Sequence, residues 1–204
     1  MKPATPTHYS QTYSGQPRHP PKCNRWRSYF HSGLESVYPI FEPGKPREIY
    51  RTYFKNLFEL VRNGRVIDGA YAAGSVPPPS DELWVYLQNL GIDMTLLDKT
   101  AAGKEQDSVD MSLQTNMFRV ALDNKPNTMA LLTGDGSGGA LGKGFLADLQ
   151  RIHRLGWNIE VYAWETTCNR YLKKFAEENG IFVPLEKYYF SITFLKGERV
   201  VSPL

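Results

Sequence analysis

The chain has 204 residues, 41% of them hydrophobic and 13% aromatic, and 24 lysines and arginines against 21 aspartates and glutamates give it a net charge of +3. This length and composition predict one globular domain whose core needs no disulfide framework or structural metal. No apolar run approaches the roughly 20 residues that a membrane-spanning helix needs, and the first residues contain no apolar segment of signal-peptide type. Two widely separated cysteines, Cys23 and Cys168, predict reduced thiols in a cytoplasmic or nuclear protein without a membrane partner.

Residues 1–27 predict a flexible, basic N-terminal arm that precedes a single domain over residues 28–204. Five basic residues and no acidic residue come before Glu35, so the arm is basic while the rest of the chain is slightly acidic. The arm has almost no aliphatic side chains, so burial cannot offset the entropy of ordering it. Its Arg25, Trp26 and Arg27 suit single-stranded nucleic acid, through phosphate charge and base stacking. A solubilising tail without a partner is the alternative interpretation.

Beyond the arm, strand and helix patterns alternate. Helices are predicted where apolar residues recur at intervals of three or four, and strands where short apolar runs end in turn residues. The expected strands are residues 27–31, 66–72, 92–97, 129–133, 158–164, 181–183 and 189–195. The expected helices are residues 47–63, 81–90, 104–122, 143–155 and 169–179, and Trp84, Trp157 and Trp164 within the elements are expected in the core. The alternation predicts an α/β fold with a mostly parallel sheet covered by helices on both faces.

The glycine-rich segment 133–139 ends the expected strand 129–133 and contains one carboxylate, Asp135. Ligands bind at the carboxyl edge of such sheets, and glycines let a ligand approach the backbone closely. An ordinary strand-to-helix turn with Asp135 as a cap is the alternative. The glycines also fit the dinucleotide pattern G-x-G-x-x-G, with Glu165 in the place of a ribose-binding acid, but Asp135 would repel the pyrophosphate. A P-loop is excluded because Ser137 and Gly144 stand where the motif needs glycine and a hydroxyl residue.

Two further carboxylates lie near the start of the expected helix 104–122. Asp107 and Asp110 are three residues apart and therefore share one face of the helix. The helix dipole alone favours acidic residues in the first turn, which explains Asp107 without a function. Asp110 lies deeper in the helix, beside the buried stripe, so the dipole explains it less well. Together with Asp135 these side chains suit Mg²⁺ or Mn²⁺ and a scissile phosphodiester.

Several segments in order resemble the NYN domains, a PIN-like nuclease family that includes LabA-like proteins. These segments are residues 60–65, 74–84, 103–110, 132–135, 156–161 and 185–194, and the resemblance covers roughly residues 28–195. It implies a PIN-like three-layer α/β/α sandwich. It also implies a metal-dependent ribonuclease, or a relative that binds RNA.

The resemblance implies a site that has lost some acids. Asp110 and Asp135 correspond to the family's helix and strand-end aspartates and are the expected catalytic and metal-binding residues. Ser32 and Ser137 stand where the family often has two more aspartates, and neutral hydroxyls are weak ligands for a hard cation. We count both serines among the expected nucleic-acid contacts, and Glu35 or Asp107 as the metal ligands that would compensate.

Lysines and one helix start complete the expected site. Lys104 and Lys143 flank it and suit RNA phosphates, although each also fits an ordinary solvated lysine. Asn169 and Arg170 begin a helix whose amides suit a phosphate, with a simple N-cap as the alternative. The leading hypothesis is therefore a metal-dependent endoribonuclease that uses Mg²⁺ or Mn²⁺ on single-stranded or structured RNA. The alternative is a catalytically degenerate domain that binds RNA or a protein partner, and the oligomeric state is left open.

Overall fold

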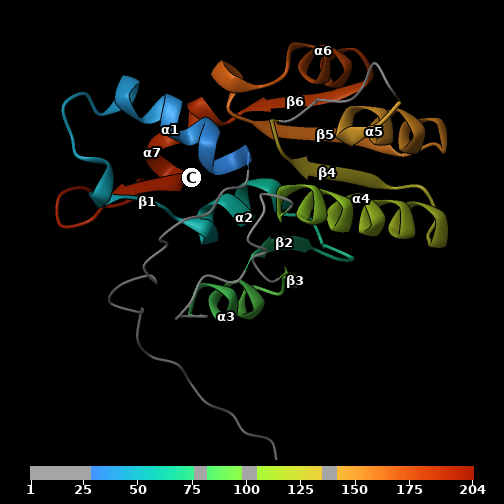
Figure 1. Cartoon of the computed structure of the whole chain (residues 1–204), viewed down its shortest axis with the longest axis horizontal. Coiled ribbons are helices and arrows are strands. Elements are labelled where there is room, and N and C mark those ends of the chain that lie inside the picture. The colour runs from blue at the N-terminus through green and yellow to red at the C-terminus, as the bar shows by residue number, and fades with distance from the viewer. Residues whose placement is uncertain (1–28, 76–81, 98–104, 135–141) are drawn as a thin grey trace, which may run out of the picture.

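The computed structural model describes residues 29–75, 82–97, 105–134 and 142–204 (Figure 1). The helices are α1 (Tyr29–Phe41), α2 (Phe54–Arg62), α3 (Glu82–Asn89), α4 (Glu105–Asp123), α5 (Gly144–Arg154), α6 (Arg170–Asn179) and α7 (Tyr189–Ile192), with short 3₁₀ turns η1 (Arg47–Ile49), η3 (Glu165–Thr167) and η4 (Leu185–Tyr188). The strands are β1 (Tyr50–Thr52), β2 (Tyr71–Ser75), β3 (Asp93–Leu97), β4 (Thr128–Leu132), β5 (Asn158–Ala163), β6 (Gly180–Pro184) and β7 (Thr193–Leu195). The predicted arm, residues 1–27, lies outside the described residues.

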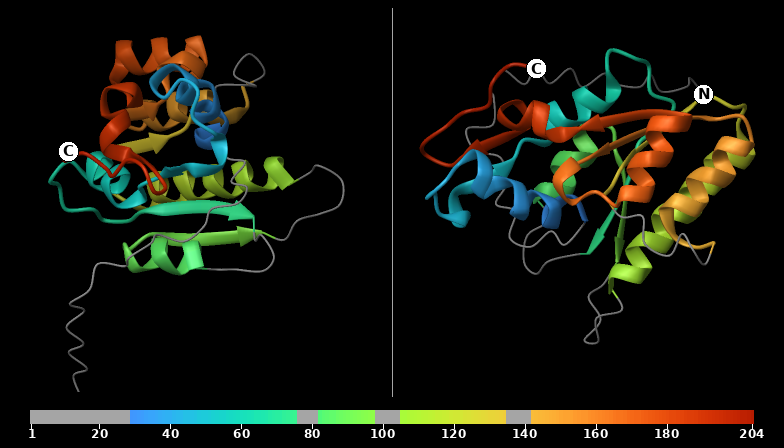
Figure 2. Two further views of the ribbon diagram at one scale, coloured as in Figure 1. Left: turned by 90° about the vertical axis from the view of Figure 1, so that its left-hand side faces the viewer. Right: turned by 90° about the horizontal axis from the view of Figure 1, so that it is seen from above.

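The described strands pair in three sheets, and most of the pairing is parallel. Strands β4, β5 and β6 form one parallel sheet, β2 and β3 form a second, and β1 and β7 form a short antiparallel pair. Helix α4 lies between the β4–β5–β6 sheet and the β2–β3 pair and packs on β2 and β3, while α6 packs on β5 and β6 (Figure 1 and Figure 2). The protein is therefore an α/β protein, although its described strands do not form one continuous sheet.

Two large apolar clusters hold these elements together. One joins α4, β4, α5, β5 and α6, and the other joins α1, α2, α7 and the end of β5. Trp84, Trp157 and Trp164 are each at most 4% exposed, so their predicted core positions are confirmed. A Cβ at Gly74 in β2 would lie 2.4 Å from Cη2 of Trp84, so the indole of α3 needs a glycine on the strand it covers. None of the helices in the described ranges is long and apolar enough to cross a membrane.

The predicted strand at residues 27–31 is wrong, because helix α1 begins at Tyr29. The helical spacing of Leu34, Val37 and Phe41 decides the structure of this segment. Leu34 and Val37 are fully buried in the second cluster. The longer apolar stripe thus predicts the secondary structure of this segment better than the short aromatic run before it.

Three other predicted elements differ from the structure, and two of them differ because distant segments pair with each other. The predicted helix 47–63 is divided into η1, β1 and α2, since β1 pairs antiparallel with β7 and Tyr53 N donates to Ile192 O at 2.8 Å. The predicted final strand 189–195 begins instead as α7 and is extended only over β7. The predicted strand 66–72 lies later in the chain, as β2, in register with β3 from Tyr71 opposite Asp93.

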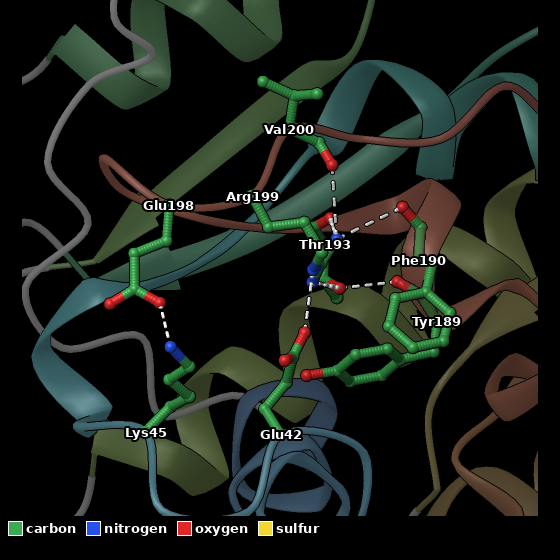
Figure 3. A network of polar contacts seen from close by, with 8 residues as sticks. All are labelled: Glu42, Lys45, Tyr189, Phe190, Thr193, Glu198, Arg199 and Val200. Atoms are coloured by element: carbon green, nitrogen blue, oxygen red, sulfur yellow. Dashed lines mark hydrogen bonds and ion pairs between the residues drawn. The ribbon is translucent and has the colours of Figure 1, made fainter.

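Arg199 connects the C-terminal segment to the end of α1, to α7 and to the start of β7 (Figure 3). Its Nε donates to Glu42 Oε1 at 2.7 Å, its Nη1 to Thr193 O at 2.7 Å and its Nη2 to Thr193 Oγ1 at 2.9 Å. The guanidinium also lies 5.6 Å from the ring centroid of Tyr189 and 5.0 Å from that of Phe190. This one side chain therefore links the C-terminal segment to Glu42, 157 residues earlier, and to the nearby residues of α7 and β7.

Candidate functional site

The carboxyl end of β4 is held against the segment that connects β5 to α6. Asn169 N donates to Gly134 O at 2.9 Å, and the ideal Cβ position of Gly134 lies 3.6 Å from Cα of Cys168. Gly134 is the last described residue before Asp135, which lies outside the described residues, as Ser137 does. The backbone that leads to the predicted catalytic residue is thus fixed to the start of α6.

The connection itself is fastened by a carboxylate from the neighbouring strand end. Glu186, in η4 after β6, accepts hydrogen bonds from Glu165 N at 2.9 Å, Thr166 N at 3.0 Å and Thr166 Oγ1 at 3.1 Å. Lys173 Nζ donates to Glu165 Oε1 at 2.6 Å from the other side. The amides of Glu165 and Thr166 would otherwise lack partners, so Glu186 holds the carboxyl ends of β5 and β6 together. Sequence reasoning missed this residue because its partners lie about 20 positions away.

The start of α1 packs on the same connection. A Cβ at Gly33 would lie 2.6 Å from Oγ1 of Thr167 and 2.9 Å from Cδ1 of Trp164, so only glycine allows this approach. Ser32 is the preceding residue and lies within α1. The structure therefore brings the helix turn that contains Ser32 and the residue before Asp135 to one connection, although it places Ser32 in a helix rather than at a strand end.

Asp110 lies in α4 and is half-buried, and Asp107 lies one turn earlier in the same helix. The predicted helix over these two positions is confirmed. Helix α4 packs on β2 and β3 and on α5. Lys104 lies outside the described residues. In the described ranges, no group of three or more His, Cys, Asp or Glu side chains is arranged to hold a metal ion.

The remaining predicted residues lie on the surface or outside the described ranges. Glu35 in α1 is exposed and forms an ion pair with Arg47, so its carboxylate already has a cationic partner. Lys143 is exposed at the N-cap of α5, and its side chain makes no capping hydrogen bond. Arg25, Trp26 and Arg27 belong to the arm, which is not described.

The surroundings of Cys168 and Asn169 indicate structural rather than catalytic roles. Burial raises the pKa of the Cys168 thiol to about 11, so it is protonated at neutral pH and is a poor nucleophile. It is a free thiol, as predicted. The side chain of Asn169 accepts from Tyr171 N at 2.9 Å and from Leu172 N at 3.4 Å, which is the N-cap arrangement.

The family of the chain is established by its sequence. The family model of the NYN domain matches residues 41–179, about two thirds of the chain. The chain belongs to the NYN-domain family. Both Asp110 and Asp135 lie within the matched residues, whereas Ser32 and Glu35 precede them. The first strand inside the match is β1, which consists of Tyr50, Arg51 and Thr52 and has no carboxylate.

Comparison with known proteins adds information about the fold alone. A crystal structure from Vibrio parahaemolyticus, described as that of a protein of unknown function, is similar with a TM-score of 0.54 and 14% sequence identity. The match covers 74% of this chain and 85% of the other. No match was found among curated proteins.

Proposed function

We propose that this NYN-domain protein is a metal-dependent endoribonuclease that hydrolyses RNA phosphodiester bonds at the carboxyl edge of its parallel strands. The observation that carries the proposal is the family match, which includes both predicted catalytic carboxylates, Asp110 and Asp135. The fixed connection between Gly134 and Asn169 supports it, because a catalytic side chain needs a rigid backbone beneath it. The proposal includes the PIN-like three-layer arrangement, with β2–β3 and β4–β5–β6 as parts of the central layer.

The proposed ligands fit a hard divalent cation because they are carboxylates. Asp110 and Asp135 would hold Mg²⁺ or Mn²⁺, with Asp107 as a third donor on the face of α4 that it shares with Asp110. A bound cation of this kind activates water and neutralises charge on the scissile phosphate. Lys104 and Lys143 would hold the RNA backbone on either side.

The arm and the two serines would extend the contact with RNA. Arg25 and Arg27 supply phosphate charge and Trp26 a stacking surface. Ser32 and Ser137 would contribute neutral hydrogen bonds rather than metal ligation.

One observation favours a second candidate function, a domain that binds RNA or a protein partner without cleaving RNA. The first strand of the matched region, β1, has no carboxylate, and Ser32 lies in α1. A site with fewer carboxylates binds a divalent cation more weakly. The RNA-binding form of this second candidate would use the same RNA contacts and differ from the nuclease in the catalytic step.

Cleavage of end-labelled single-stranded RNA with Mn²⁺ or Mg²⁺ tests the proposal. We expect metal-dependent products that EDTA abolishes and that Asp135→Asn and Asp110→Asn each reduce by about 100-fold or more, since a metal site contributes several kcal/mol to the transition state. Asp123→Asn, an exposed change at the other end of α4, is the matched control and should retain full activity. Cleavage that survives Asp135→Asn contradicts the site, and RNA binding without cleavage by the wild-type protein supports the second candidate function.

A further inference from the structure

An exposed arginine–tyrosine pair occupies the first turn of α6. The Arg170 guanidinium carbon lies 4.6 Å from the ring centroid of Tyr171, and Arg170 Nη2 donates to the Tyr171 hydroxyl at 2.6 Å. Tyr171 is nevertheless 57% exposed. Exposed tyrosine and arginine side chains are the residues that contribute most often to strong binding sites. The Arg170 guanidinium therefore lies against a tyrosine ring that still has surface open to a ligand.

The pair is attached to the candidate site through a rigid backbone. Asn169, the residue before Arg170, donates its amide to Gly134 O at 2.9 Å, and its side chain caps the amides of Tyr171 and Leu172. Leu172 is fully buried and anchors the turn in the core. Arg170 and Tyr171 therefore lie one and two residues after Asn169, whose amide fixes the end of β4, and the first turn of α6 holds their backbone in place.

The charges around the pair leave Arg170 available to an anion. Glu165 is paired with Lys173, and the Glu186 carboxylate is occupied by backbone amides of η3. No carboxylate pairs with Arg170 in the part of the chain that the structure describes. Its guanidinium holds the tyrosine ring and keeps further N–H donors for an incoming group.

We propose that Arg170 and Tyr171 form a base-stacking subsite for single-stranded RNA next to the cleavage site. The Tyr171 ring stacks on an unpaired base, and the Arg170 guanidinium contacts an adjacent phosphate. Bases in a duplex have no free face, so the subsite selects single strands. This inference rests on the proposed function for its ligand class, and it adds two residues of this chain that contact the substrate.

Fluorescence anisotropy with a fluorescein-labelled single-stranded RNA decamer tests the subsite, with the full chain in EDTA so that the RNA stays intact. Stacking on one aromatic side chain changes affinity by a factor of roughly 5 to 150, so Tyr171→Ala should raise Kd by about that factor. Tyr171→Phe should stay within about twofold, because stacking needs the ring and not the hydroxyl. Arg170→Ala should lower the slope of log K against log salt by about 0.7, as expected for one lost phosphate contact.

The matched control is Tyr71→Ala, because Tyr71 is also exposed, at 45%, but lies at the amino end of β2. It should leave Kd unchanged. The change at Tyr171 leaves in place the backbone amide that Asn169 caps. Thermal unfolding of Tyr171→Ala and Tyr71→Ala at the wild-type Tm verifies that both variants are folded.

The outcomes separate this inference from the proposed function. Wild-type binding by Tyr171→Ala, together with cleavage that depends on Asp135, overturns the subsite and leaves the nuclease standing. Equal loss of affinity for single-stranded and duplex RNA overturns the selectivity for single strands. A wild-type protein that binds no RNA in EDTA overturns the subsite, and the cleavage assay with Mn²⁺ or Mg²⁺ then decides separately on the nuclease.

Discussion

Replacing Arg199 by methionine should cost the fold far more than an ordinary surface arginine would. The guanidinium bonds Glu42 and both the carbonyl and the hydroxyl of Thr193 (Figure 3). The side chain of Arg199 is 22% exposed and that of Glu42 is 12% exposed, so the pair is largely shielded from water. Methionine retains most of the apolar stem, and the change therefore isolates the loss of the charged group.

The expected loss in the free energy of unfolding follows from the Glu42 carboxylate, which Arg199→Met leaves without its ion-pair partner. Removing one partner of a buried ion pair costs about 3–5 kcal/mol, and a hydrogen bond to a charged group contributes about 1.5–3 kcal/mol. Because Arg199 is partly exposed, water can replace some of these contacts, and we expect a loss of about 2–4 kcal/mol in the free energy of unfolding. For a chain of this size that corresponds to a fall in Tm of roughly 5–15 °C.

Urea and thermal unfolding, followed by circular dichroism, measure this loss. The double variant Arg199→Met with Glu42→Gln should regain at least half of it, since the unpaired charge is then removed. Arg47→Met is the matched control, because the ion pair of Arg47 with Glu35 is 64% and 43% exposed and should contribute at most about 1 kcal/mol. Equal stability of Arg199→Met and Arg47→Met would refute the reasoning, and so would a double variant that is less stable than Arg199→Met alone.

Three further experiments test other contacts, two with variants and one by chemical labelling. Gly180→Ala places a Cβ 2.1 Å from Ile159 O, between paired strands, and should destabilise the protein by at least about 2–3 kcal/mol in urea unfolding. Burial alone would raise the pKa of Glu160, but hydrogen bonds from the Arg65 guanidinium and a neighbouring tyrosine outweigh it and lower the pKa. The stability that Glu160 contributes is therefore present above its usual pKa of 4.5 and is lost as the pH falls further, so unfolding of Glu160→Gln and wild type should converge in acid. Cys168, with its pKa raised by burial to about 11, should resist iodoacetamide at pH 7.5 in the folded chain and react in urea, as peptide mass spectrometry would show.

The elements that sequence reasoning located well are marked by patterns within their own residues. Helix α4 was expected at residues 104–122 and occupies Glu105–Asp123, because its apolar stripe recurs over several turns and Met117 is buried in the core. Helix α6 has both an N-cap at Asn169 and a glycine, Gly180, after its last residue. Such local patterns need no knowledge of distant residues.

The elements that sequence reasoning misplaced are decided by distant partners. Strand β1 would continue a helical pattern, but its backbone pairs with β7, about 140 residues later. The same limit applies to the candidate site, where Glu186 secures η3 and Asn169 secures Gly134 through contacts between separate elements. Sequence patterns propose the carboxylates, and only the fold shows what holds the backbone before Asp135.

The number of carboxylates determines how the proposed site would act. Asp110 and Asp135 alone are a weak pair for a hard cation, because Mg²⁺ and Mn²⁺ take six ligands and prefer several charged oxygens. The RNA phosphate would then supply part of the coordination, and cation and RNA would each raise the affinity of the site for the other. Base stacking on Tyr171 needs no cation, since it depends on the ring alone. Loss of Asp135 should therefore abolish cleavage and the dependence of RNA affinity on the cation, while the affinity that Tyr171 contributes in EDTA persists.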